Sequence, residues 1–244
     1  MKRNFYLLVV LLTASFFSYS QEEIYGTWYK VNDGDGPSRE RIVVTSDSLS
    51  VERLQDYGVE TPYWEQDKVS PIEQVKVIEE GIQIIAYDKT QNLYKGGELT
   101  YDGSMGKLSF YQSRETFSDI DAVYEMLEIN KYKQLLAKPY YFKSRTEQIA
   151  SYPNLEALPK NQVVELFKYL LSLEPLVDEY LNENSTERHA RMLAIRGIEN
   201  MRDQKLIEMG FNPYAMTDTY YGDKFQDDPD LIKLNEQSKY FKLF

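Results

Sequence analysis

Hydrophobic and polar residues alternate in short runs between positions 22 and 113, with turn-forming residues between the runs. Such alternation is typical of antiparallel strands that have one buried face. Ser46-Asp47 and Asp102-Gly103-Ser104 supply turn residues between neighbouring runs. Pro62 restricts residues 59–65 to at most an edge strand. The remaining runs predict strands over residues 24–31, 41–45, 48–52, 74–78, 82–87, 93–101 and 107–111, forming an antiparallel meander or a small barrel.

The pattern changes to helical spacing after residue 118. Pro139 ends the first predicted helix, and Pro175 must kink or split the second. Asp228 precedes Pro229 as the cap of the last helix. The helices are predicted over residues 119–137, 159–181 and 184–210 and from residue 228 onward. The fold class is therefore α+β, with a β-rich domain over residues 21–115 and a helical region over residues 116–244.

The first twenty residues have the layout of a secretory signal peptide. Lys2-Arg3 precedes an apolar run from Phe5 to Phe17, and Ser18-Tyr19-Ser20 then places small residues before Gln21. The run is shorter than the roughly 20 apolar residues of a membrane span, although an uncleaved N-terminal anchor is the alternative. We expect residues 1–20 to be removed and the protein to be exported, to the periplasm or as a secreted or cell-surface protein, with no transmembrane segment in the mature chain.

Charge and composition exclude several classes of function. The chain has 28 Lys and Arg against 39 Asp and Glu, for a net charge of -11. An acidic chain is a poor ligand for phosphate backbones, so we expect no nucleic-acid partner. No cysteine is present and His189 is the single histidine. Disulfides, thiolate sites and multi-histidine zinc sites are therefore excluded, and we expect neither a cofactor nor a metal site.

The first predicted strand carries a short family motif. Gly26-Thr27-Trp28 resembles the glycine-x-tryptophan element that opens the first strand of lipocalin-type (calycin-type) barrels. In that family the tryptophan closes the barrel floor and an arginine just past the last strand packs across it. The resemblance covers the N-terminal half only, and it implies that Arg114, just past the predicted strand 107–111, packs over Trp28. It makes Gly26, Trp28 and Arg114 structural closure residues rather than catalytic ones.

The predicted helix 184–210 carries a row of basic residues. Arg188, Arg191 and Arg202 lie opposite the face that helical projection buries. One interpretation is a docking face for an acidic partner or a polysaccharide carrying carboxylates or sulfates. The other is a solvated face with surface ion pairs. The predicted buried face consists of Ala190, Leu193, Ala194, Gly197, Ile198 and Met201.

No catalytic motif is evident, since the chain has neither a Gly-x-Ser-x-Gly elbow nor a glycine-rich phosphate loop. The aromatic pairs Tyr140-Tyr141 and Tyr220-Tyr221 are predicted in loops, at the seam between the two halves. We expect a non-catalytic bacterial envelope protein that binds a small apolar or amphiphilic ligand, or a protein or polysaccharide partner. Alternatives are a structural or assembly component of an envelope complex, and a carbohydrate-active enzyme with an unrecognised carboxylate pair.

Overall fold

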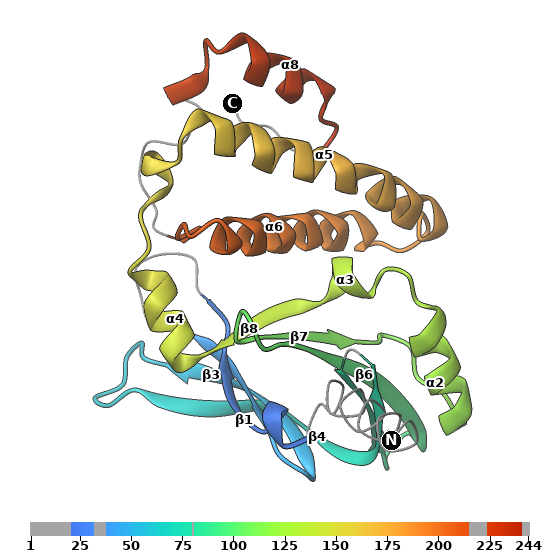
Figure 1. Cartoon of the computed structure of the whole chain (residues 1–244). Coiled ribbons are helices and arrows are strands. Elements are labelled where there is room, and N and C mark those ends of the chain that lie inside the picture. The colour runs from blue at the N-terminus through green and yellow to red at the C-terminus, as the bar shows by residue number, and fades with distance from the viewer. Residues whose placement is uncertain (1–20, 32–37, 80, 215–223, 241–244) are drawn as a thin grey trace, which may run out of the picture.

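The computed structural model describes residues 21–31, 38–79, 81–214 and 224–240. It contains a closed barrel of eight antiparallel strands, followed by a layer of helices (Figure 1). The strands are β1 (Gly26–Tyr29), β2 (Glu40–Val44), β3 (Ser48–Gln55), β4 (Tyr63–Ile78), β5 (Gly81–Asp88), β6 (Leu93–Asp102), β7 (Lys107–Gln112) and β8 (Lys138–Phe142). The predicted α+β class, with an antiparallel barrel before a helical region, is confirmed. The predicted signal peptide and the pair Tyr220-Tyr221 lie outside the described residues.

Strand β8 closes the barrel and comes from a part of the chain that we expected to be loop and helix. It pairs with β7 on one side and with β1 on the other, where Trp28 lies opposite Phe142. Pro139 fits because it stands near the start of the strand, where a missing N–H matters least. Five residues are too few to show a clear alternation, which is why the sequence did not reveal this strand. The barrel therefore extends beyond residue 115.

The barrel interior is an apolar core built by the alternation predicted from sequence. Trp28 lies beside Ile42, which in turn pairs with Val51, so one ring of inward side chains crosses three strands. On the far side, Leu108 is paired with Tyr140 of β8. The buried members are Ile24, Trp28, Ile42, Val44, Leu49, Ile82, Ile84, Leu99, Leu108, Phe110 and Tyr140.

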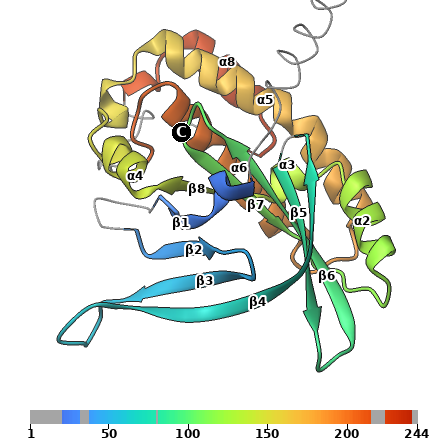
Figure 2. The same ribbon diagram turned by 60° about the horizontal axis from the view of Figure 1, so that its bottom comes forward.

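Strand β4 is longer than the predicted run 74–78. It begins at Tyr63, directly after Pro62, and continues through Pro71. With β3 it forms a long hairpin that extends past the rest of the sheet (Figure 2). A register shift between Val51 and Glu52 marks a bulge in this hairpin, and bulges bend a strand and increase its twist.

Two short helices, α2 (Ile120–Ile129) and α3 (Lys133–Leu136), replace the predicted helix 119–137. Asn130 ends α2, because its side-chain oxygen accepts from the N–H of Tyr132 and its amide donates to the Tyr111 hydroxyl. Helix α2 covers the outer face of β5 and β6 (Figure 1). A Cβ at Gly96 would lie 2.5 Å from Val123, so the missing side chain lets this helix approach closely.

The remaining helices form a second core above the barrel. They are α4 (Lys143–Ala150), the short 3-10 turn η2 (Leu155–Ala157), α5 (Lys160–Glu183), α6 (Ala190–Glu208) and α8 (Pro229–Gln237), and a 3-10 turn η1 (Gln21–Ile24) precedes the barrel. Pro175 lies within α5 without splitting it. Helix α6 begins at Ala190 rather than near residue 184, because Asn184 ends α5. Asp228 caps α8 as predicted, accepting from the N–H groups of Asp230 and Leu231.

Helix α6 packs directly on α3. A Cβ at Gly197 would come within 2.2 Å of the Leu135 carbonyl oxygen, so only glycine permits this approach. Ala194 and Ile198 are buried on the same face, as predicted, while Leu193 and Met201 are half-buried at its margins. Figure 1 shows α6 between α5 and the barrel. The margin of this contact leaves a space beside the end of the barrel.

Candidate binding cleft

A cleft of about 660 Å³ lies between one end of the barrel and helix α6. Its volume is within the range of about 300–1,000 Å³ that is usual for ligand sites. The walls come from strand ends on one side and from α3 and α6 on the other. The lining residues are Lys30, Val31, Glu40, Arg53, Leu135, Leu136, Lys138, Leu193, Arg196, Gly197, Glu199, Asn200, Arg202, Asp203 and Tyr214.

The barrel topology places four charged residues at one end of neighbouring strands. Lys30 follows the last residue of β1, and Glu40 begins β2. Arg53 of β3 lies directly opposite Glu40 in the sheet. Lys138 begins β8, which pairs with β1 on its other edge. Because the strands are antiparallel, these starts and ends all meet at the same rim of the barrel.

The cleft has a charge opposite to that of the whole chain. Five cationic side chains line it against three anionic ones, so its walls have a net charge of +2, whereas the chain has a net charge of -11. Lys30, Lys138 and Arg196 form no ion pair with another described residue. A concave basic surface on an acidic protein concentrates anions locally.

Glu40 is the anionic group among these cations. Its Oε1 accepts a hydrogen bond from the Tyr140 hydroxyl at 2.7 Å. Burial raises the pKa of Glu40, but the Tyr140 hydrogen bond and the charges of Lys138, Lys30 and Arg53 outweigh it, so the pKa lies below its ordinary value of 4.5. Burial and the neighbouring Glu40 raise the pKa of Tyr140 well above 10. Glu40 is therefore an ionised acceptor at neutral pH.

The α6 wall carries a different arrangement. Arg202 is paired with its neighbour Asp203, with its Nη2 2.7 Å and its Nε 2.9 Å from Oδ1. Arg196 and Glu199 are exposed, and Asn200 is half-buried beside them. Gly197 adds no side chain, which lets the helix approach α3 closely at the edge of the cleft. Arg196 is thus the cation of α6 that faces the cleft without a partner acid among the described residues.

Among the described residues, the barrel interior is closely packed. A space found there is about 10 Å³, no more than one water molecule needs, and apolar residues of β2, β4 and β5 line most of it. Aromatic stacking fills the middle, where the Trp28 ring lies 3.8 Å from that of Phe142 and 5.8 Å from that of Tyr101. The expectation of an apolar ligand inside a hollow barrel is not supported by this packing.

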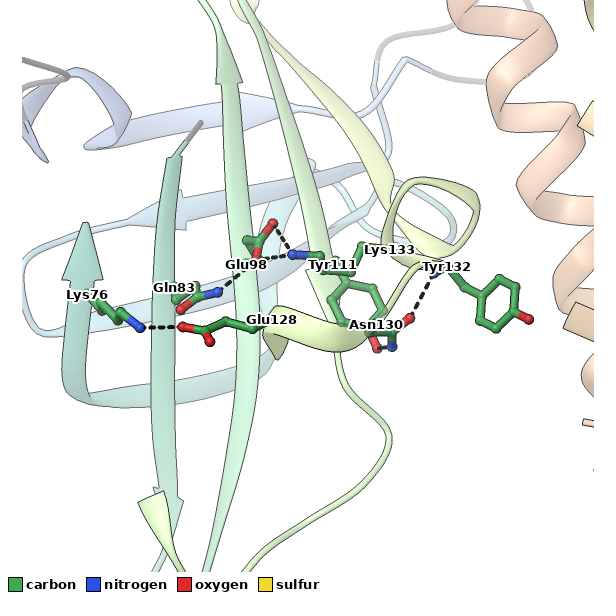
Figure 3. A network of polar contacts seen from close by, with 8 residues as sticks. All are labelled: Lys76, Gln83, Glu98, Tyr111, Glu128, Asn130, Tyr132 and Lys133. Atoms are coloured by element: carbon green, nitrogen blue, oxygen red, sulfur yellow. Dashed lines mark hydrogen bonds and ion pairs between the residues drawn. The ribbon is translucent and has the colours of Figure 1, made fainter. Parts of the chain in front are cut away.

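A second polar cluster lies on the outside of the barrel, where α2 and α3 meet β5 and β6 (Figure 3). Lys133 of α3 reaches both carboxylate oxygens of Glu98, at 2.9 and 2.7 Å, and Gln83 donates to the same carboxylate at 3.2 Å. Lys76 and Glu128 form a further ion pair at 2.6 Å. The ion pairs join the helices to the sheet, so we assign the cluster a structural role, although the buried Gln83 Oε1 has no hydrogen-bond partner.

The structure places the three expected closure residues as follows. Gly26 opens β1 with a φ of 139°, a conformation that favours glycine. Trp28 is fully buried in the barrel core, and its Nε1 donates to the Ile24 carbonyl at 2.9 Å. Arg114 is half-exposed and forms an ion pair with Glu187, in the segment before α6. The cation–ring contacts of the described residues do not include Arg114 with Trp28.

The three arginines of the predicted docking face separate in the structure. Arg188 and Arg191 are exposed at the start of α6, whereas Arg202 is half-buried and lines the cleft near the other end of the helix. Docking on this face stays a prediction. The predicted tyrosine loop is instead strand β8, with Tyr140 inside the barrel and Tyr141 packed at the seam against Ile149 and Ile207.

Sequence reasoning missed Lys30, Glu40, Arg53 and Lys138 as site residues. The position of charged residues at strand ends was a usable signal for the first three, since antiparallel neighbours bring such ends together. Lys138 had no such signal, because its strand was not predicted.

Within the described residues no cluster of three or more His, Cys, Asp or Glu side chains is placed to hold a metal ion. No helix among them has both the length and the apolar composition needed to cross a bilayer. No protein-family model matches the chain, and neither the curated proteins nor the solved structures contain a significant match to it.

Proposed function

We propose that this chain is an exported, non-catalytic binding protein of the bacterial envelope, which holds a small polar ligand in the cleft between the barrel and α6. The observation that carries the proposal is the contrast between a barrel filled by its own side chains and a 660 Å³ polar cleft beside it. Ligand sites are concave and commonly lie between structural units. The barrel itself we assign to the calycin type, on the resemblance of Gly26-Thr27-Trp28 and the eight-stranded closed topology.

The exposed apolar side chains of the helices favour this proposal over an assembly component that docks through its helical half. The large, exposed apolar side chains of the described helices are Ile129, Met192 and Ile232, one each on α2, α6 and α8. Single exposed apolar residues are normal on monomers, whereas interfaces need a continuous patch. Export rests on the predicted signal peptide over residues 1–20.

Blocking the cleft tests the binding proposal. Asn200→Trp places a large ring on the α6 wall, and Asn182→Trp places the same ring on the exposed surface of α5, outside the cleft. Both variants and the wild type are screened by thermal shift against neutral sugars, amino acids, hydroxy acids, sugar acids and phosphates. We expect at least one class to stabilise the wild type and Asn182→Trp but not Asn200→Trp. If no class binds, or if Asn200→Trp binds equally well, the proposal fails.

Export is tested separately. Mass spectrometry of the protein recovered from the cell envelope should show a mature N-terminus at Gln21. An intact Met1 in a cytosolic fraction would contradict the exported location and leave the cleft proposal standing.

A further inference from the structure

The cations of the cleft come from both of its walls and from four separate elements. Lys30, Arg53 and Lys138 stand on the barrel rim, and Arg196 stands on α6. Arg53 has a surface partner in Asp67, at 3.2 Å, with both side chains about half-exposed. Surface pairs of this kind are weak, on the order of 0–1 kcal/mol, so Arg53 remains available to a ligand. An anion in the cleft would contact cations on opposite sides.

The net charge of the walls favours an anionic ligand. Glu40 offsets one of the rim cations, and Arg202 and Asp203 form a pair with no net charge. A ligand anion would reduce the repulsion that remains among the like charges of this concave surface. The ligand chemistry that relieves this repulsion is a carboxylate, sulfate or phosphate group.

Glu40 adds a second requirement. One carboxylate oxygen accepts from Tyr140, and the other takes no hydrogen bond from a described residue. An ionised carboxylate only accepts hydrogen bonds, so a ligand that contacts this oxygen should bring a donor to it. An ammonium donor would be repelled by Lys30, Arg53 and Lys138, whose charges act on the same carboxylate. A neutral hydroxyl meets the requirement without that repulsion.

We infer that the ligand of the cleft is a hydroxylated anion of the sugar-acid type, whose acidic group is bound between the rim cations and Arg196 and whose hydroxyl donates to Glu40. This inference rests on the proposed binding function and adds the chemical class of the ligand. The acidic group supplies most of the attraction, and the hydroxyl fixes the orientation, because Tyr140 already occupies the other oxygen of Glu40.

Isothermal titration with matched probes tests the inference on the full mature chain. Glucuronate, galacturonate and gluconate carry both a carboxylate and hydroxyls, glucose carries hydroxyls alone, and inorganic phosphate carries charge alone. We expect at least one of the three acids to bind tenfold more tightly than glucose and than phosphate. Its affinity should fall as salt is raised, because partly exposed charges are screened. If none of the acids binds, the inference is overturned.

The other outcomes distinguish this inference from the proposed function. If glucose binds as tightly as glucuronate, the cleft still binds a ligand, but the role assigned to the acidic group is overturned. Phosphate binding as tightly as the acids would overturn the role of Glu40. If some other ligand class from the cleft-blocking screen binds and all three acids fail, only the inference falls.

Single substitutions locate the contacts. Arg196→Gln should weaken binding of the acid at least tenfold, while Arg188→Gln, in the turn just before the same helix and outside the cleft, should leave it unchanged. Glu40→Gln should reduce the preference for the acid over phosphate, because the amide offers the ligand hydroxyl a weaker acceptor than a carboxylate. Equal binding by Arg196→Gln and Arg188→Gln would contradict the assignment, and circular dichroism verifies that both variants are folded.

Discussion

The barrel interior and the cleft use the same strands for opposite purposes. Trp28 and Ile42 of β1 and β2 point inward and are fully buried, whereas Lys30 and Glu40, at the rim ends of the same two strands, line an open charged space. Inside a narrow eight-stranded barrel the side chains meet in the middle, so little volume is left for a ligand. At the rim the strands end and α6 bridges the opening, which leaves space between them. In this molecule the barrel supplies stability and its rim supplies the candidate chemistry.

Because of this difference, we expect substitutions in the barrel interior and substitutions in the cleft to have different effects. Apolar side chains of the interior have no alternative environment, so their loss leaves a cavity. Charged side chains at the cleft remain hydrated when a neighbour is removed, so their loss should change binding more than folding.

Trp28→Ala should cause the greatest loss. The ring is fully buried and stacked on Phe142, so its removal leaves a cavity that neighbouring strands cannot fill, at a cost of about 3–5 kcal/mol. Leu193→Ala, at the half-buried edge of the cleft, should cost only about 1 kcal/mol. Urea denaturation of both variants measures the difference. Equal losses would show that the cleft edge is as tightly packed as the barrel.

Gly197→Ala should have the next largest effect. The new methyl would collide with the Leu135 carbonyl, so α6 must move away from α3, at a cost of about 1–3 kcal/mol. The same movement should change the width of the cleft and weaken the binding of any ligand there. Glu199→Ala, exposed on the same helix, is the matched control and should stay within about 0.5 kcal/mol of the wild type. Full stability of Gly197→Ala would contradict the close helix contact.

Glu40 makes the rim sensitive to acid. Its pKa is lower in the folded state than its ordinary value of 4.5, so its contribution to stability is present above that pH and is lost as the pH falls through the folded value. The stability difference between the wild type and Glu40→Gln should therefore shrink as the pH falls below about 5. Tyr140→Phe should reduce the difference by removing one hydrogen bond to the carboxylate. A difference that does not vary with pH would contradict an ionised, stabilised Glu40.

Arg196→Gln should have the smallest effect on folding. The side chain is exposed and forms no ion pair with a described residue, so stability should change by no more than about 0.5 kcal/mol. The same variant is the one expected to lose the ligand, which separates binding from stability at a single residue. Thermal unfolding without ligand measures the first effect. A large destabilisation would mean that Arg196 supports the fold instead.

Part of the fold could be predicted because it depends on local patterns. The predicted strands 82–87 and 93–101 match β5 and β6 closely, and because α2 covers their outer face, residues of both faces are buried. The buried face of α6 followed from its 3.6-residue period, and the cap at Asp228 followed from the proline after it. The break at Asn130 was missed because it depends on a hydrogen bond to Tyr111, a residue of a distant strand.

The sequence by itself determined the order of the first seven strands and of the longer helices, the apolar core and the excess of negative charge, because each depends on neighbouring residues or on totals. Only the tertiary structure decided that residues 138–142 complete the barrel and that Lys30, Glu40, Arg53, Lys138 and Arg196 share one cleft. Those relations depend on which strands pair and on how closely α6 approaches α3 at Gly197. Pairing between residues more than a hundred positions apart is selected by the packing of the whole chain, and no local pattern records it.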